Sequence, residues 1–274
     1  MTRIFLLILA ISLPLLAHPQ QTKDRSITSE EFNEPRPKPR KRTGHPPKRR
    51  TYRLASPPLA EPLDKFSPST LKVGVTLWKV ERVNDGRSTA EVARRVEAGT
   101  QFHEGDLLRL SIESPRTGYL YVVDRDWLTD GSSGETKLIF PLRGDDNRLE
   151  AGKLIDIPAE HDSPFKTTPK PNQAGEMLTI IVTKTPLLLP LSTHELPVPN
   201  PQLAEWERKW SGMTERFEMI DGVGQARTNE ERQAASPRGT RQLTRDDPSP
   251  QTIYFLTPRS GDGLLFNLLL SYAR

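Results

Sequence analysis

The sequence contains no cysteine. This absence excludes disulfide bridges, a thiolate nucleophile, cysteine-ligated zinc and a lipid-modified N-terminal cysteine. The N-terminal apolar run from Ile4 to Ala17 is also shorter than the roughly 20 residues that a membrane-spanning helix needs, so no transmembrane helix is expected in the mature chain.

Sequence patterns typical of catalytic sites are missing as well. No serine lies in a Gly-x-Ser-x-Gly turn, and the chain has neither a phosphate-binding glycine loop nor a dinucleotide fingerprint. The histidines outside the N-terminal run, His45, His103, His161 and His194, lack metal-ligand spacing. We therefore expect a non-enzymatic protein without a cofactor.

The first 19 residues are typical of a secretory signal peptide. One arginine, Arg3, precedes the apolar run, and polar residues follow it. Residues 1–19 thus predict export to the periplasm or the extracellular space, with association with the envelope as a further expectation. Leu15 stands where a small residue is usual before cleavage after Ala17, so an uncleaved N-terminal anchor is the alternative.

Residues 20–68 are rich in proline, charge, serine and threonine, and we expect them to be a disordered linker. Within them, residues 35–53 (PRPKPRKRTGHPPKRRTYR) carry nine Lys and Arg and no acid; subtracting these nine from the net charge of +4 leaves −5 for the rest. Contact with an anionic surface is one interpretation, and a solvated spacer is the other. Nucleic acid is not expected as a partner of an exported protein. The candidate contact residues are Arg36, Lys38, Arg40, Lys41, Arg42, Lys48, Arg49, Arg50 and Arg53.

Residues 69–274 contain short β-type runs bounded by Gly, Pro, Asp or Ser, with little helix between them. They predict a mainly β fold, an antiparallel β-sandwich that is Ig-like or barrel-like, with one amphipathic helix. Residues 118–124 (GYLYVVD) are apolar on both alternating faces and predict a central strand. The expected strands are 71–83, 106–114, 117–124, 136–140, 153–157, 177–184, 252–257 and 264–273.

The predicted helix covers residues 201–220. Asn200 is suited to capping it, Pro201 to its first turn, and apolar residues recur from Leu203 to Ile220 at helical spacing. We expect this stripe to pack on the sandwich; the alternative is a structural protein that binds its partner through the 203–220 face. Residues 223–250 are polar and are expected to be a flexible insertion.

An acidic stretch between two predicted strands resembles a calcium loop in spacing only. Asp124, Asp126, Asp130, Ser132 and Glu135 occupy ligand positions of a twelve-residue EF-hand window, but Thr129 replaces the required glycine and Leu128 replaces an oxygen ligand. We therefore expect the loop of a hairpin. Four residues remain weak metal candidates: Asp124, Asp126, Asp130 and Glu135. The alternative function is a hydrolase or metal-dependent enzyme with a site in loops 124–135 and 143–147.

Six pieces follow one another between about residues 100 and 184: FHEGDLLRLSIES, GYLYVVD, KLIFP, NRLEAGK, IDIPA and GEMLTIIVTKTPL. In their order and spacing they resemble a bacterial family, domain of unknown function 4384. The resemblance implies a small β-rich module in exported proteins, without an established active site, in which Gly118, Tyr119, Pro141, Gly152 and Pro158 are structural. We accordingly expect a module for binding or assembly at the bacterial cell envelope, whose partner is an unknown protein or envelope component.

Overall fold

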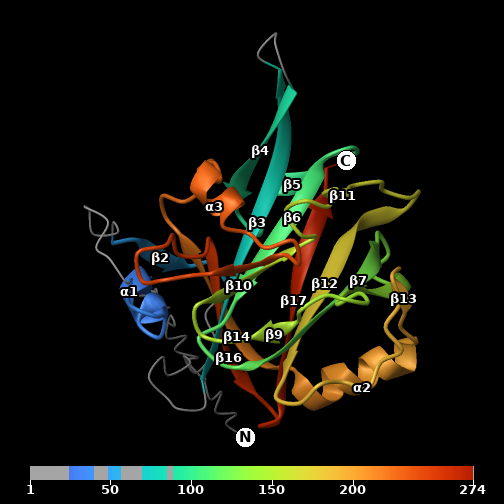
Figure 1. The fold of residues 1–274 in the computed structure, drawn as a ribbon. Helices are drawn as coiled ribbons and strands as arrows, with labels where there is room; N and C mark the ends of the chain where they lie inside the picture. The colour runs from blue at the N-terminus through green and yellow to red at the C-terminus, as the bar shows by residue number, and fades with distance from the viewer. Residues whose placement is uncertain (1–24, 40–48, 57–69, 85–88, 274) are drawn as a thin grey trace, which may run out of the picture.

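The computed structural model describes residues 25–39, 49–56, 70–84 and 89–273. The described strands form two sheets that pack face to face, and short helices lie outside them (Figure 1). This arrangement confirms the predicted mainly β sandwich. The predicted signal peptide, residues 1–19, lies outside the described residues. Among the residues that are described, no helix has the length and apolar character needed to cross a membrane.

Sheet A is antiparallel and has the order β1-β2-β14-β16-β3-β6-β10-β15, with β4 paired to β3 and β11 to β6. Its strands are β1 (Ser26–Thr28), β2 (Thr51–Leu54), β3 (Leu71–Asn84), β4 (Thr89–Val96), β6 (Leu107–Glu113), β10 (Lys153–Ile157), β11 (Phe165–Lys166), β14 (Gly212–Met219), β15 (Thr240–Gln242) and β16 (Thr252–Pro258).

Sheet B has the order β13-β8-β7-β12-β17-β5, with β9 paired to β7. Its pairings are antiparallel except between β17 and β5, which run parallel. Its strands are β5 (Gln101–Phe102), β7 (Gly118–Leu128), β8 (Ser133–Phe140), β9 (Arg148–Leu149), β12 (Gln173–Thr183), β13 (Leu196–Pro197) and β17 (Gly263–Tyr272).

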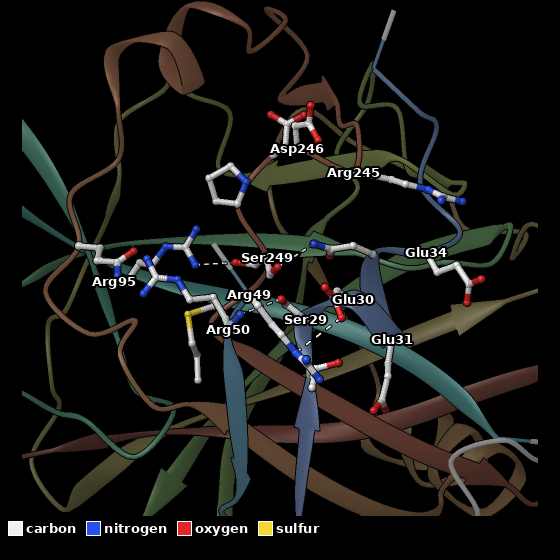
Figure 2. A pocket seen from close by; sticks show the side chains of 16 residues that line it. Ser29, Glu30, Glu31, Glu34, Arg49, Arg50, Arg95, Arg245, Asp246 and Ser249 are labelled. Atoms are coloured by element: carbon white, nitrogen blue, oxygen red, sulfur yellow. Dashed lines mark hydrogen bonds and ion pairs between the residues drawn. The ribbon is translucent and has the colours of Figure 1, made fainter. Parts of the chain in front are cut away.

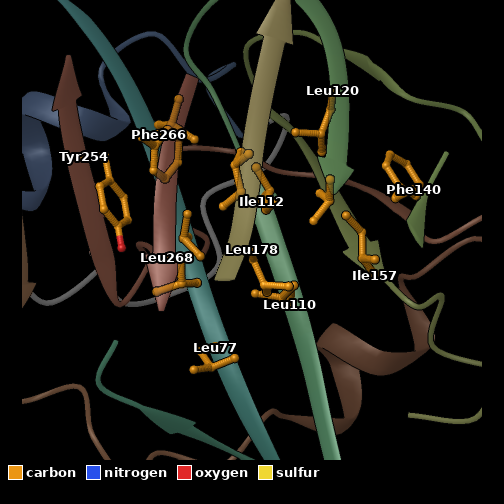
Figure 3. Packing of buried hydrophobic residues seen from close by; sticks show 14 of the residues in the cluster. Leu77, Leu110, Ile112, Leu120, Phe140, Ile157, Leu178, Tyr254, Phe266 and Leu268 are labelled. Atoms are coloured by element: carbon orange, nitrogen blue, oxygen red, sulfur yellow. The ribbon is translucent and has the colours of Figure 1, made fainter. Parts of the chain in front are cut away.

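The main core lies between the sheets. Alternate residues of each strand point inward, as Leu110 and Ile112 do from β6 and Leu120 does from β7 (Figure 3). Burying each such side chain fully contributes about 1.5–3 kcal/mol to stability. All eight predicted strands coincide with observed ones, because this alternation is visible in the sequence.

The predicted hairpin at the acidic stretch is present, but its strands are longer than expected. Strands β7 and β8 pair from Val122 and Phe140 to Trp127 and Ser133, which leaves only residues 129–132 as the loop. Asp124 and Asp126 therefore lie on β7, and Glu135 lies on β8.

The helix prediction is wrong beyond residue 210. Helix α2 (Asn200–Trp210) ends there, and Gly212–Met219 form β14, between β2 and β16. A Cβ on Gly212 would collide with the Thr257 carbonyl, so this glycine allows the close approach of β16. Phe217 is buried as a strand residue, whereas Ile220 is 56% exposed. Pairing with β16 thus overrides the apparent helical spacing.

Helix α2 covers the outer face of sheet B. Its apolar residues Leu203, Trp206 and Trp210 are buried against residues of that sheet, including Tyr121 and Leu265. The part of the stripe that is helical therefore packs on its own sandwich, as expected, and these three side chains are not exposed to a partner.

The disorder predicted for residues 20–68 is wrong where the structure describes them. Strand β1, helix α1 (Ser29–Asn33) and strand β2 extend sheet A, and β2 pairs with β14. Ile27, Phe32 and Tyr52 are buried with Phe217, Ile253 and Phe255 in a second apolar cluster. A few apolar residues, scattered among prolines and charged residues, are therefore sufficient to anchor this segment to sheet A.

Residues 223–250, predicted to be a flexible insertion, are also built into the fold. They contain α3 (Asn229–Gln233) and β15, and a capping box between Thr228 and Glu231 begins α3. Strand β15 pairs with β10 at the edge of sheet A. Figure 1 shows α1, β2 and α3 on one side of the molecule and α2 on the other.

Candidate functional site

A polar cleft of about 620 Å³ lies where α1 and the start of β2 meet the loop 245–249 (Figure 2). It lies beside the described part of the basic segment, and Arg49 and Arg50 of that segment line it. Its acidic residues are Glu30, Glu31, Glu34, Asp246 and Asp247, and its basic residues are Arg49, Arg50, Arg95 and Arg245.

Short hydrogen bonds hold the walls of this cleft. Ser29 and Arg50 are joined twice: Ser29 N donates to the Arg50 carbonyl (2.9 Å), and Arg50 N donates to the Ser29 side-chain Oγ (3.0 Å). On the opposite wall, Ser249 Oγ accepts from Asn33 Nδ2 at 2.7 Å, and its carbonyl accepts from Arg95 Nη1 at 2.6 Å (Figure 2). Burial lowers the pKa of Arg95, and nearby acids, Glu231 first, oppose that shift.

Acidic and basic side chains lie next to one another in the cleft, so neither sign of charge predominates there. The exposed Arg49 guanidinium, for example, lies 3.6 Å from the Glu30 carboxylate. Carboxylates and guanidiniums side by side can pair with both signs of a polar chain, such as a peptide. They do not form a simple anion trap.

Arg36 is misassigned as a surface-contact residue. Its guanidinium is 3% exposed and forms an ion pair with Glu113 at 2.6 Å, and it also donates to the carbonyls of Asp247 (2.9 Å) and Pro248 (3.2 Å). Arginine is suited to this role because its planar fork binds a carboxylate and several carbonyls at once. Arg36 therefore anchors the N-terminal segment to β6 and to the 245–249 loop.

The other candidates for anionic contact divide into two groups. Lys38, Arg49 and Arg53 are exposed, and Arg50 is half-buried in the cleft wall. Arg40, Lys41, Arg42 and Lys48 lie outside the described residues.

The carboxylates near the β7–β8 turn are mostly occupied by local partners. Asp130 accepts from Ser132 N (2.9 Å) and Ser132 Oγ (2.7 Å), which stabilises the turn. Asp126 accepts from Lys170 at 2.8 Å and Gln173 at 3.1 Å, and Glu135 lies 3.3 Å from the same lysine. These bonds are sufficient to explain the acidic pattern structurally.

Asp124 differs from its neighbours because it points between the sheets. It is 9% exposed, and its Oδ1 is buried without a hydrogen-bond partner. Burial, reinforced by the charge of Glu176, raises the pKa of Asp124 from its ordinary 3.8 to about 7. Burial also raises the pKa of Glu176, against the hydrogen bond that Tyr272 donates to it.

The two loops of the alternative enzyme site are not brought together. The turn 129–132 precedes β8 and loop 143–147 follows it, so the length of this strand, roughly 25 Å, separates the turn from that loop. Asp124 is nearer, since Asn147 is hydrogen-bonded to Leu120, four residues or roughly 13 Å along β7 from Asp124. Asp145 accepts from Leu142 N (2.7 Å) and Asp146 from Lys153 (2.7 Å). Within the described ranges, no three His, Asp or Glu side chains lie close enough to hold a metal ion.

Sequence reasoning missed a buried ionic network on the outer face of sheet A. Asp156 of β10 accepts from Ser111 (2.5 Å) and Arg227 (2.5 Å), and Ser111 accepts from the Trp78 indole (2.8 Å). Arg227 and Arg95 lie 5.7 Å and 5.2 Å from the Trp78 ring centroid. The polar residues alternating with apolar ones in β6 were the available signal, but they do not identify their partners.

Comparison with protein families yields one match. Residues 101–186 match the sequence model of a family described as Domain of unknown function (DUF4384). This confirms the resemblance. No match was found among the curated proteins or among the solved structures.

The DUF4384 match covers β5 to β12, which contribute to both sheets. Strands outside it complete the sandwich, since β6 pairs with β3 and β12 pairs with β17. The folded unit that surrounds the matched range is therefore considerably larger than the match.

Proposed function

We propose that this chain is an exported, non-enzymatic β-sandwich module that binds a partner at the bacterial cell envelope. The observation that carries the proposal is the anchoring of the basic segment on both sides. The Arg36–Glu113 ion pair holds one end of it, and pairing of β2 with β14 holds the other. A spacer would need no such attachment to the folded body.

The exposed cations provide the attraction. Lys38, Arg49 and Arg53 lie close to the two anchors, and the sequence between them adds Arg40, Lys41, Arg42 and Lys48 without an acid. Each Lys or Arg near an acidic membrane contributes about 1 kcal/mol, and the attraction weakens as salt shortens the Debye length. The mixed-charge cleft beside them would then contact polar chains of the same surface.

Co-sedimentation tests this proposal. Protein expressed from residue 20 would be mixed with purified cell-wall sacculi, or with vesicles of anionic or neutral lipid, at low and high salt. We expect salt-sensitive binding to anionic material and its loss in the triple variant Lys38→Ser, Arg49→Ser, Arg53→Ser.

The matched control removes the same charge elsewhere, by Arg82→Ser, Arg208→Ser and Arg259→Ser, all at exposed positions. Equal binding by both triple variants would show that only net charge matters. Absence of binding to every surface at low salt would refute the envelope role.

A further inference from the structure

A cavity of about 140 Å³ opens between the two sheets beside β11. Side chains from both sheets form its apolar walls, among them Leu108 and Leu110 of β6, Ile139 of β8 and Leu178 of β12, and Phe165 of β11 lies across it. The cavity is thus continuous with the sandwich core on one side and opens to solvent beside the exposed Lys166, Thr168 and Glu195. It is distinct from the cleft at the basic segment, and none of its lining residues belongs to that segment.

Ionisable side chains line the cavity, and most of them already have partners. Glu176 accepts the hydrogen bond of the Tyr272 hydroxyl. Lys137 lies directly opposite Asp124 in the β7–β8 register, yet its ammonium pairs with Glu195 at 2.7 Å. Asp124 is the exception among the buried ones, with its Oδ1 unpaired, whereas Lys166 is exposed to solvent.

An unpaired buried carboxylate oxygen is unfavourable, because it has lost its bonds to water without gaining others. A hydrogen-bond donor carried by a ligand would remove this penalty. The charges around the cavity favour a donor group that is positively charged. Three carboxyl groups line the cavity, those of Asp124, Glu176 and Glu195, against two ammonium groups, those of Lys137 and Lys166. An anionic ligand would meet three carboxylates, whereas a cation would balance them.

We propose that this cavity binds the primary ammonium group of a short aliphatic amine, which donates to Asp124 while its alkyl chain packs against the apolar walls. A cavity of about 150 Å³ accommodates a ligand the size of benzene, so this space is suited to a chain of about four carbons. A free amine and a lysine side chain of a peptide share this chemistry.

Binding should strengthen as pH rises. The groups facing Asp124 are Glu176 of β12, Lys137 of β8, Lys166 of β11, Tyr272 of β17 and Glu195. The ammonium binds the ionised form of Asp124, whose pKa is about 7, so the bound ammonium lowers that pKa. Affinity should therefore increase between about pH 6 and pH 8, while butylamine remains protonated.

Isothermal titration calorimetry of the full chain with n-butylamine hydrochloride tests the site. We expect one binding site per chain at about pH 8 and at least tenfold weaker binding by Asp124→Asn, because a charge-assisted hydrogen bond is lost. Asp145→Asn, the same change beyond the other end of β8, should bind as the wild type does. Butyrate should not bind.

Two probes distinguish the sources of the amine. If Nα-acetyl-lysine amide competes with butylamine, the site accepts a lysine side chain; if only butylamine binds, the ligand is a free amine. Both results support the proposal. Absence of butylamine binding to the wild type at millimolar concentration would overturn it, as would equal binding by Asp124→Asn.

An NMR measurement on the wild-type chain tests the site even if the Asp124→Asn variant does not fold. With ¹³C-labelled aspartate, the carboxyl resonance assigned to Asp124 should shift on titration with butylamine, and the Asp145 resonance should not. Calorimetric binding without a shift at Asp124 would place the amine elsewhere and overturn the assignment.

Discussion

The two outer faces of the sandwich are covered by different chemistry. On sheet B, α2 is packed through Leu203, Trp206 and Trp210, which are apolar and buried. On sheet A, the N-terminal segment packs through the apolar residues Ile27, Phe32 and Tyr52, but its Arg36 and residues 223–243 are held by buried ion pairs. These pairs are Arg36–Glu113, Arg227–Asp156 and Arg241–Glu231.

Apolar contacts and buried ion pairs contribute differently to the free energy of folding. Apolar burial is favourable wherever the surfaces fit, whereas a buried ion pair must first offset the loss of hydration of both charges. Arg227 and Asp156 are each 1% exposed at their side chains, so that loss is nearly complete. We infer that α2 supplies net stability, while the ionic cover mainly determines where two polar segments lie.

The largest expected effect comes from removing one partner of the ionic cover. Asp156→Ala removes the closest carboxylate from the buried Arg227, which keeps only its second ion pair, with Glu160 at 2.8 Å, and it removes the acceptor of Ser111. We expect the free energy of unfolding to fall by about 3–5 kcal/mol in urea titrations. Glu91→Ala, which breaks the exposed Arg82–Glu91 pair, should change it by about 0–1 kcal/mol.

Replacing both charges sharpens the comparison. The double variant Asp156→Leu, Arg227→Met should recover most of the stability lost in Asp156→Ala, because both fully buried charges are gone and the carboxylate that loses its partner, Glu160, is partly exposed. A double variant as unstable as the single one would show that the ionic cover contributes net stability, contrary to our inference.

The apolar cover should respond to truncation of a ring. Trp206→Ala removes a side chain that is 6% exposed and stacks on Trp210 with centroids 6.3 Å apart. We expect a loss of about 3 kcal/mol in the same urea titrations, with little dependence on salt. A loss below about 1 kcal/mol would mean that α2 is only loosely attached.

Unlike the residues that cover the two outer faces, Asp124 between the sheets should make the free energy of unfolding depend on pH. Since the folded-state pKa of Asp124 is raised to about 7, its contribution to stability is full below its ordinary 3.8 and is lost as pH rises through 7. Asp124→Asn should therefore be more stable than the wild type, by about 2 kcal/mol at pH 8, and less so near pH 4. Thermal unfolding across this range checks the sign, and a variant that is less stable at pH 8 would contradict it.

The smallest effect concerns the local support of the ionic cover. Thr228 accepts from Glu231 N at 3.1 Å, and the Glu231 carboxylate accepts both from Thr228 N and from Arg241. Thr228→Ala should reduce the free energy of unfolding by about 1 kcal/mol. Thr228→Ser, which keeps the hydroxyl, is the matched control and should remain near the wild type.

The sequence was informative where periodicity is local. Leu178, Ile180 and Val182 alternate toward the core, so β12 could be predicted from its own residues. The helix was overextended because Phe217 happens to continue the spacing of Trp206 and Trp210, although it is buried by strands of sheet A. A distant pairing decides that conformation, and no local signal reports it.

The sequence indicates which residue types belong to the candidate sites, but it does not show which of them are partners in the fold. Asp124 and Asp126 were recognised as an acidic pair, yet only the fold shows that Asp126 has a lysine partner and that Asp124 is unpaired between the sheets. Arg36 was grouped with the surface cations because its neighbours in sequence are basic. Its carboxylate partner, Glu113, lies on a strand more than seventy residues away.

The positions of β16 and β17 have a consequence for the order of assembly. Strand β16 lies between β14 and β3, and β17 lies between β12 and β5, so each sheet is joined through a strand that comes after residue 250. A chain emerging from the ribosome N-terminus first cannot complete either sheet until these strands appear. Until then the DUF4384-matching strand β12 would expose an unpaired edge, and such an edge can pair with another chain.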